Sequence, residues 1–184
     1  KPFFLYLAYN APHSPIQPPD EWLERVRRLR PDLGDKQARL VALVEHLDDG
    51  IGRVMAALEG TGLAGNTLVV FTSDNGGVVS YGSSNGPHRD GKQSMYEGGL
   101  KVPAAVVWPG KIAPGTVTRL RAMTMDLFPT LVEAAGADLT HEIDGVSFLP
   151  TLLGRDQPEL RTDWFFTRRE GNASYGGKTI DAVI

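Results

Sequence analysis

Two neighbouring side chains, Asp74 and Asn75, have the residue types and the position to hold a metal ion. They follow the apolar run 68–71 almost directly, and that run predicts a strand buried on both faces of a parallel sheet. Ligands of open α/β sheets bind just beyond the carboxyl ends of such strands, and carboxylate and amide oxygens suit calcium or magnesium. The same Asp-Asn-Gly sequence also favours an ordinary turn, so the residues alone permit both interpretations.

Three further polar residues lie in loops next to predicted strands. His13 follows the apolar run 3–9 and stands between two prolines, which keep its loop non-helical. His88 and Lys92 lie in residues 78–94, a long loop without periodicity, and such loops are commonly functional or disordered. Each of the three residues could equally be an ordinary surface residue. Our hypothesis is one site that gathers His13, Asp74, Asn75 and Lys92.

The remaining pattern predicts the elements that would position this site. Strands are expected at 3–9, 68–71, 103–108 and 164–167, and helices at 20–30, at 36–59 with Asp35 as N-cap, and after Asp126 as a second N-cap. Strands that alternate with helices predict an α/β fold with a mostly parallel sheet flanked by helices.

Composition excludes several classes of function. The chain has 184 residues, a formal net charge of −3 and a pI near 5.8, so it lacks the basic footprint of a nucleic-acid binder. No apolar run approaches the roughly 20 residues of a membrane span. The absence of cysteine removes disulfides, thiolate metal sites and a cysteine nucleophile from this chain.

Several segments, taken in order, resemble the sulfatase family of the alkaline-phosphatase superfamily. Ser73-Asp74-Asn75-Gly76 and the sequence Glu-Gly-Gly-x-x-Val-Pro of residues 97–103 are the most specific among them. The matching segments are residues 3–13, 66–76, 91–92, 96–103, 125–130 and 144–147. The resemblance covers nearly the whole chain and implies an alkaline-phosphatase-like fold.

The resemblance also implies roles for the site residues in the hydrolysis of a small-molecule or carbohydrate sulfate ester. Asp74 and Asn75 would bind a divalent cation, for which the family generally uses calcium. His13 would lie beside the sulfate and the leaving oxygen, and Lys92 would contact the sulfate. A cation and an ammonium group stabilise the negative charge that builds up on the departing oxygens, and an imidazolium supplies the proton that the leaving group needs. His88 is a further candidate for contact with substrate.

The chain departs from the family pattern in ways that predict a partial domain. It lacks the Cys/Ser-x-Pro-x-Arg motif that matures to the formylglycine nucleophile, and it lacks the paired aspartates that the family carries near its amino terminus as further metal ligands. We therefore expect residues 1–184 to be the second half of a catalytic domain that ends near the start of the carboxyl-terminal subdomain. Alone, the chain should bind metal weakly, have no turnover and self-associate through an unpaired sheet edge. The family suggests a periplasmic or secreted protein.

Other functions remain open at this point. A phosphonate or phosphodiester hydrolase could use the same scaffold, because sulfate and phosphate esters share geometry and charge pattern. A non-catalytic binding protein could keep the fold without the chemistry, and a complete 184-residue product could act as a structural or interaction module. Asn172-Ala173-Ser174 also fits a glycosylation sequon.

Overall fold

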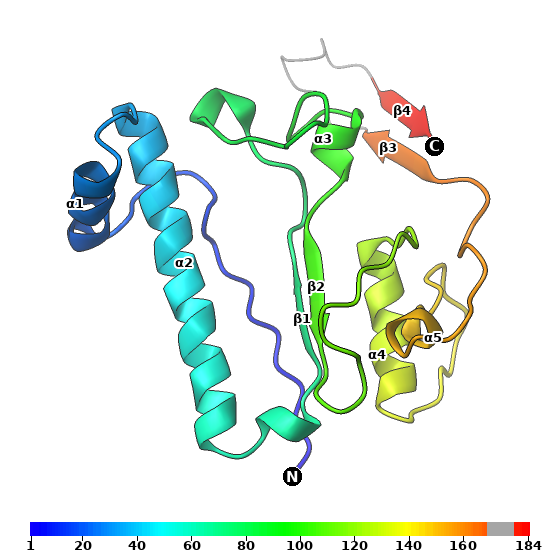
Figure 1. Ribbon diagram of the computed structural model, residues 1–184. Coiled ribbons are helices and arrows are strands. Elements are labelled where there is room, and N and C mark those ends of the chain that lie inside the picture. Colours follow the sequence, from blue (N-terminus) through cyan, green and yellow to red (C-terminus); the bar gives the residue numbers. More distant parts are fainter. Residues whose placement is uncertain (169–178) are drawn as a thin grey trace.

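The computed structural model describes residues 1–168 and 179–184, so the sequon at Asn172 lies outside the described residues. Figure 1 shows two helices on one side, a central two-stranded ribbon, and the carboxyl-terminal elements on the other side. The helices are α1 (Asp20–Leu29), α2 (Asp35–Gly60), α3 (Glu97–Leu100), α4 (Leu127–Ala134) and α5 (Leu149–Leu152). The strands are β1 (Val69–Thr72), β2 (Ala104–Val107), β3 (Phe165–Arg168) and β4 (Ile180–Val183).

The strands pair differently from the prediction. β1 pairs antiparallel with β2, with Val69 opposite Val107 and Thr72 opposite Ala104, and β3 pairs antiparallel with β4. The predicted parallel sheet is therefore not formed among residues 1–168 and 179–184. The chain leaves β1 at its carboxyl end, folds into loops there and enters β2 from that same end (Figure 1). An apolar run fixes the place of a strand, but the direction of its partner depends on the connection.

The predicted strand at residues 3–9 is absent, because no described strand pairs with this segment. Its large apolar side chains are also exposed rather than buried; Phe4 and Tyr6, for example, are 78% and 80% exposed. An extended backbone counts as a strand only when a neighbouring backbone bonds to it. The segment runs between α2 and the β1–β2 ribbon (Figure 1).

The predicted helices are found. α1 and α2 pack together around a small core of Leu23, Val26, Ala38 and Ala42. Asp35 is not the N-cap of α2: Gly34 holds that position, and Asp35 is the first helical residue, where it pairs with Arg27 and Arg39. None of the helices in the described part of the chain combines the length and apolarity needed to cross a membrane.

Asp126 is the N-cap residue of α4, as predicted, but its side chain makes no capping hydrogen bond to that helix. Its carboxylate is fully buried and accepts hydrogen bonds from Met123 N (2.7 Å), Val146 N (2.8 Å) and Arg161 Nη1 (2.9 Å). Burial on its own raises the pKa of Asp126, but the hydrogen bonds from Arg161 and the two backbone N–H groups outweigh it, so the pKa lies below its ordinary value. Asp126 thus joins the start of α4 to two later segments. Its bond from Val146 N holds the segment after α4, and its ion pair with Arg161 holds the segment after α5.

Acid should therefore weaken the fold through Asp126. Because the folded-state pKa is depressed, its stabilisation is present above the unfolded pKa of about 3.9 and is lost as pH falls through the folded-state pKa. Arg161→Met, which leaves a buried charge unpaired, should cost about 3–5 kcal/mol at neutral pH. Urea unfolding as a function of pH measures both effects. Asp156→Asn, which alters an exposed carboxylate, is the control and should leave the pH profile unchanged.

Candidate functional site

The turn that carries Asp74 and Asn75 leaves β1 and packs against residues 89–99. Gly76 N donates to Gly99 O (3.0 Å), and Lys92 N donates to Gly77 O (3.1 Å). The structure thus brings the backbone of the Lys92 loop against the residues that follow the Asp74–Asn75 pair, although the two segments are separated in sequence.

Glycines allow this close contact. A Cβ atom on Gly76 would lie 1.7 Å from Gly98 O, and one on Gly91 would lie 2.1 Å from Gly77 O. A Cβ on Gly99 would lie 2.2 Å from Ser94 O. Each distance is far below van der Waals contact, so only a residue without Cβ fits there. These glycines belong to segments that resemble the family, and the close contact of the backbones is the physical reason for them.

The backbone beside Lys92 is strained on both sides. Asp90 and Gln93 have φ of 65° and 78°, a left-handed conformation that is uncommon for residues other than glycine. Asp90 relieves part of this strain locally, because its Oδ1 accepts a hydrogen bond from Gly91 N (2.9 Å). Strained residues of this kind cluster at functional sites, where the surroundings hold them in place.

Asn85 is a residue that the sequence interpretation missed. Its Oδ1 accepts a hydrogen bond from Gly77 N (2.8 Å), and its Nδ2 donates to Gly77 O (3.1 Å) and Asp90 O (2.8 Å). In the sequence, Asn85 stands in a run of glycine, serine and asparagine that indicates a loop. Nothing in that composition distinguishes an asparagine that bonds two backbone segments from one that is solvated.

Asp74 and Asn75 fit the requirements of a hard cation. Among the described residues, the exposed Asp74 carboxylate has no hydrogen-bond or ion-pair partner. Asn75 donates from Nδ2 to Gly76 O (3.2 Å), which leaves its Oδ1 to accept or to bind metal. A calcium ion takes six to eight oxygen ligands, and no group of three His, Cys, Asp or Glu side chains gathers in residues 1–168 and 179–184. Two ligands are therefore available here, and the others would come from elsewhere.

The Lys92 side chain is half-buried, and its ammonium group has no hydrogen-bond or ion-pair partner among the residues that the structure describes. Only its backbone N–H is bonded, to Gly77 O. A partly desolvated lysine without a carboxylate partner retains its full capacity to bind an anion.

His13 is exposed and lies in the loop after the unpaired segment. Its Nδ1 lies 2.8 Å from Ser14 O, and because a carbonyl only accepts, Nδ1 carries the proton and Nε2 remains free. Within the described chain, no hydrogen bond joins His13 to Lys92 or to the Asp74–Asn75 pair. Figure 1 shows residues 1–10 and β1 running toward the same end of the molecule. The gathering of His13 with the other three residues stays a prediction.

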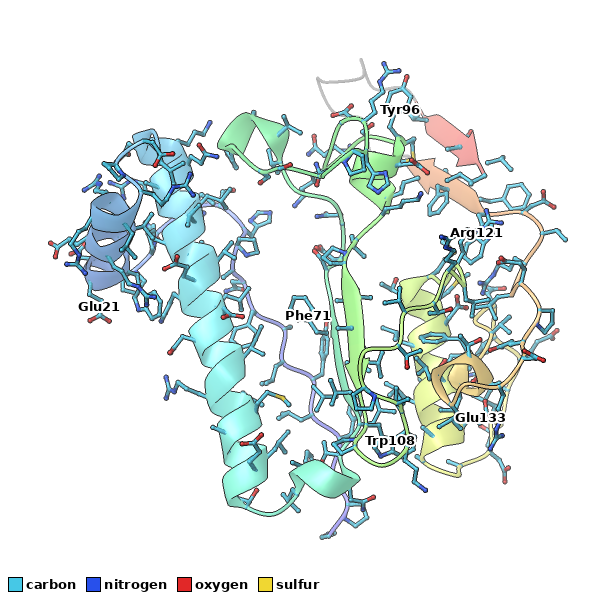
Figure 2. All side chains as sticks on the ribbon, viewed as in Figure 1. Glu21, Phe71, Tyr96, Trp108, Arg121 and Glu133 are labelled. Carbon is cyan, nitrogen blue, oxygen red and sulfur yellow. The ribbon has the colours of Figure 1, made fainter. Side chains whose placement is uncertain are left out.

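His88 belongs to a charged cluster at the edge of these loops. Its Nδ1 lies 3.1 Å from Glu97 Oε2, and Lys101 Nζ lies 2.5 Å from Glu97 Oε1. Hydrogen bonds from Lys101 and, second, from His88 lower the pKa of Glu97. Beside this cluster, the Arg89 guanidinium lies 3.8 Å from the ring centroid of the exposed Tyr96, which Figure 2 shows at the end of the molecule that carries these loops. Contact between His88 and substrate stays a prediction.

Comparison with known proteins tests the family resemblance. The model of the sulfatase family matches residues 1–137, which include β1, β2 and both packed loops. The chain belongs to the sulfatase family. The predicted family is thereby confirmed, and the roles of individual residues follow from it only as proposals.

Several known proteins with different names are similar to this chain over part of their length. N-acetylgalactosamine-6-sulfatase of Mus musculus is 40% identical over 158 residues, which cover 83% of this chain and 29% of that protein. Ps i-CgsB, solved in complex with k-i-k-neocarrahexaose, is 33% identical with a TM-score of 0.87 and coverage of 100% of this chain and 39% of that one. Phosphonate monoester hydrolase SpPMH from Silicibacter pomeroyi is 28% identical with a TM-score of 0.62, over 78% and 28% of the two chains. The sulfatase chain thus spans about a third of each relative's length.

Gly76→Ala should disturb the packed loops of this sulfatase chain. The new Cβ would overlap Gly98 O, and overpacking typically costs about 1–3 kcal/mol. Hydrogen exchange should accelerate at Gly76 N and Lys92 N, and the thermal midpoint should fall.

Gly52→Ala is the matched control, because a Cβ there meets nothing within 4 Å inside helix α2. It should be neutral or stabilise by up to about 1 kcal/mol. Equal effects of the two substitutions would contradict the close-packing explanation.

Proposed function

We propose that this chain is the second half of the catalytic domain of a metal-dependent, arylsulfatase-like hydrolase that cleaves sulfate monoesters. One observation carries the proposal. The loops of Asp74 and Lys92 are held backbone to backbone, and the charged ends of both side chains have no partner in the described part of the chain. An anion and a cation bound together would use both groups.

Each residue has a role that its chemistry can perform. Asp74 and Asn75 would supply oxygen ligands to calcium, which when bound would stabilise the negative charge on the sulfate oxygens. Lys92 holds a sulfate oxygen through its ammonium group, and His13 delivers a proton from its ring to the leaving oxygen. The formylglycine nucleophile and the remaining metal ligands lie outside this chain, so residues 1–184 alone are inactive.

The relatives support a carbohydrate or small-molecule sulfate ester as the substrate class. One relative is an N-acetylgalactosamine-6-sulfatase, and another was solved in complex with k-i-k-neocarrahexaose. His88 and its neighbours Arg89 and Tyr96 stand at the rim of the proposed site, where they are candidates for contact with the rest of the substrate.

A phosphonate or phosphodiester hydrolase is the second candidate, and the similarity to a phosphonate monoester hydrolase supports it. The cation, lysine and histidine would act in the same way on a phosphoryl group. A non-catalytic binding protein, the third possibility, would keep the loops but lose turnover on every ester.

The proposed partner of this chain is the remainder of the same polypeptide. An apolar face, which we define as residues 3–9, the exposed side of β1 and the carboxyl-terminal half of α2, is incompletely covered. Phe4 and Tyr6 are 78% and 80% exposed, and Phe71 projects from β1 toward α2 while 43% exposed (Figure 2). Relatives are about three times as long as this chain, which is length enough for a covering layer.

Lys92→Ala in the full-length polypeptide should lower kcat/KM for an aryl sulfate ester about 10²–10³-fold, because the transition state loses one charge-stabilising donor. Steady-state kinetics with added calcium measures the effect. Lys111→Ala is the control, since Lys111 is an exposed lysine in a separate turn, and it should leave kcat/KM unchanged.

The same assay decides between the candidate functions. Turnover of the aryl sulfate that is lost with a chelator and restored by calcium supports the proposal. Equal or greater turnover of an aryl phosphate or phosphonate ester would favour the second candidate. If no ester is turned over, the non-catalytic binding protein is the remaining candidate function.

The 184-residue chain should self-associate through the apolar face when the rest of the polypeptide is absent. Phe4→Lys combined with Tyr6→Lys should shift it toward monomer, because the new charges oppose burial of the face. Sedimentation velocity measures the distribution. Val117→Lys, at a 90% exposed position in another loop, should have no effect. An unaltered chain that remains monomeric up to its solubility limit would contradict this prediction.

A further inference from the structure

The Asn85 side chain bonds two loops whose ends carry the proposed site. Its amide has one acceptor oxygen and two donor hydrogens. Oδ1 accepts from Gly77 N (2.8 Å), and Nδ2 donates to Gly77 O (3.1 Å) and to Asp90 O (2.8 Å). Both donor hydrogens and the acceptor are therefore in use, and all three partners are backbone atoms.

The surroundings of this amide fix its orientation. A Cβ on Gly91 would lie 2.7 Å from Asn85 Nδ2, and one on Gly77 would lie 3.4 Å from Asn85 Oδ1. The amide group thus lies against two glycines, and at Gly91 even a Cβ atom would be too close to it. A reversed amide would place Nδ2 against the N–H of Gly77 and Oδ1 against two carbonyl oxygens, so only one orientation satisfies the partners.

One oxygen atom links Asn85 to Lys92. Gly77 O accepts from both Asn85 Nδ2 and Lys92 N, at 3.1 Å each, which uses both lone pairs of the carbonyl. Gly77 follows the Asp74–Asn75 pair closely in sequence, and Asp90 precedes Lys92. Asn85 therefore acts at both ends of the span that connects the proposed metal ligands to the proposed sulfate-binding lysine.

The same amide restrains the strained backbone before Lys92. Asp90 has φ of 65°, a conformation that persists only where the surroundings impose it. The hydrogen bond from Asn85 Nδ2 holds the Asp90 carbonyl, while Gly91 N donates to Asp90 Oδ1. Without the Asn85 amide, Asp90 could relax and carry the Lys92 backbone with it.

We infer that Asn85 is a positioning residue, which sets the distance between the Asp74–Asn75 pair and Lys92 without touching substrate or metal. The inference rests on the proposed function for its effect on turnover, whereas its effect on the loops is independent of that function. Loss of a residue that orients metal ligands or catalytic groups typically lowers metal affinity or activity about 10–100-fold. We expect an effect of that size here.

Asn85→Asp in the full-length polypeptide is the sharpest test. The substitution keeps the shape and the acceptor for Gly77 N, but it places a carboxylate oxygen against Gly77 O and Asp90 O in place of the Nδ2 donor. We expect kcat for an aryl sulfate ester to fall about 10–100-fold, with KM changed much less, and half-maximal activity to require more calcium. Hydrogen exchange should accelerate at Gly77 N and Lys92 N and stay unchanged in α1.

Two matched controls separate positioning from general damage. Asn66→Asp makes the same chemical change at an exposed residue, and Ser84→Ala removes a hydroxyl that accepts a hydrogen bond from Gly86 N in the same loop. Both should keep kcat and the exchange of the two amides. If Asn85→Asp fails to fold, Asn85→Ala offers a smaller change that lacks the repulsive oxygen and should give the same pattern of exchange.

Each outcome is decisive. A folded Asn85 variant with unchanged kcat, or with unchanged exchange at Gly77 N and Lys92 N, would overturn the inference. A lower thermal midpoint with unaltered kcat would assign Asn85 a purely structural role and would overturn it too. If the unaltered protein turns over no ester, the proposed function fails instead, and the exchange of the two amides still decides whether Asn85 holds the loops together.

Discussion

The Gly77 carbonyl oxygen is the point at which the two functional loops meet. It accepts hydrogen bonds from Lys92 N and Asn85 Nδ2, and a Cβ atom on Gly91 would lie 2.1 Å from it. Only glycine therefore fits at position 91. The contact joins the backbone of the Lys92 loop to the residues that follow the Asp74–Asn75 pair, and the Asn85 side chain bonds to the same carbonyl oxygen.

The rest of the described fold gives these loops limited support. α1 and α2 share a small core, and the buried Asp126–Arg161 pair joins α4 to the segments after it. Between them, the apolar face around β1 remains incompletely covered. Because hydrophobic burial is the dominant favourable term in folding, the rigidity of the site depends on whatever packs against that face. The contact between the loops and the covering of the apolar face are therefore two separate requirements of the fold.

Family membership and the free charges of the loops agree with each other. The Lys92 ammonium group and the Asp74 carboxylate, each without a partner among the described residues, suit a tetrahedral oxyanion held beside a cation. The similarity to enzymes named for sulfate and for phosphonate esters indicates that the fold alone does not determine which of the two esters is the substrate.

The sequence alone determined helices α1, α2 and α4, the places of β1, β2 and β3, the types of the polar residues and the family, because periodicity, strand propensity and motif order are local properties of the chain. Only the tertiary structure decided that β1 and β2 run antiparallel, that residues 3–9 lie unpaired, that Asn85 bonds to Gly77 and Asp90, and that Arg161 pairs with the distant Asp126. The physical reason is the same in each case. A hydrogen bond, an ion pair or a strand pairing depends on which partner the connecting chain brings near, and the residue type reports only the capacity to bond.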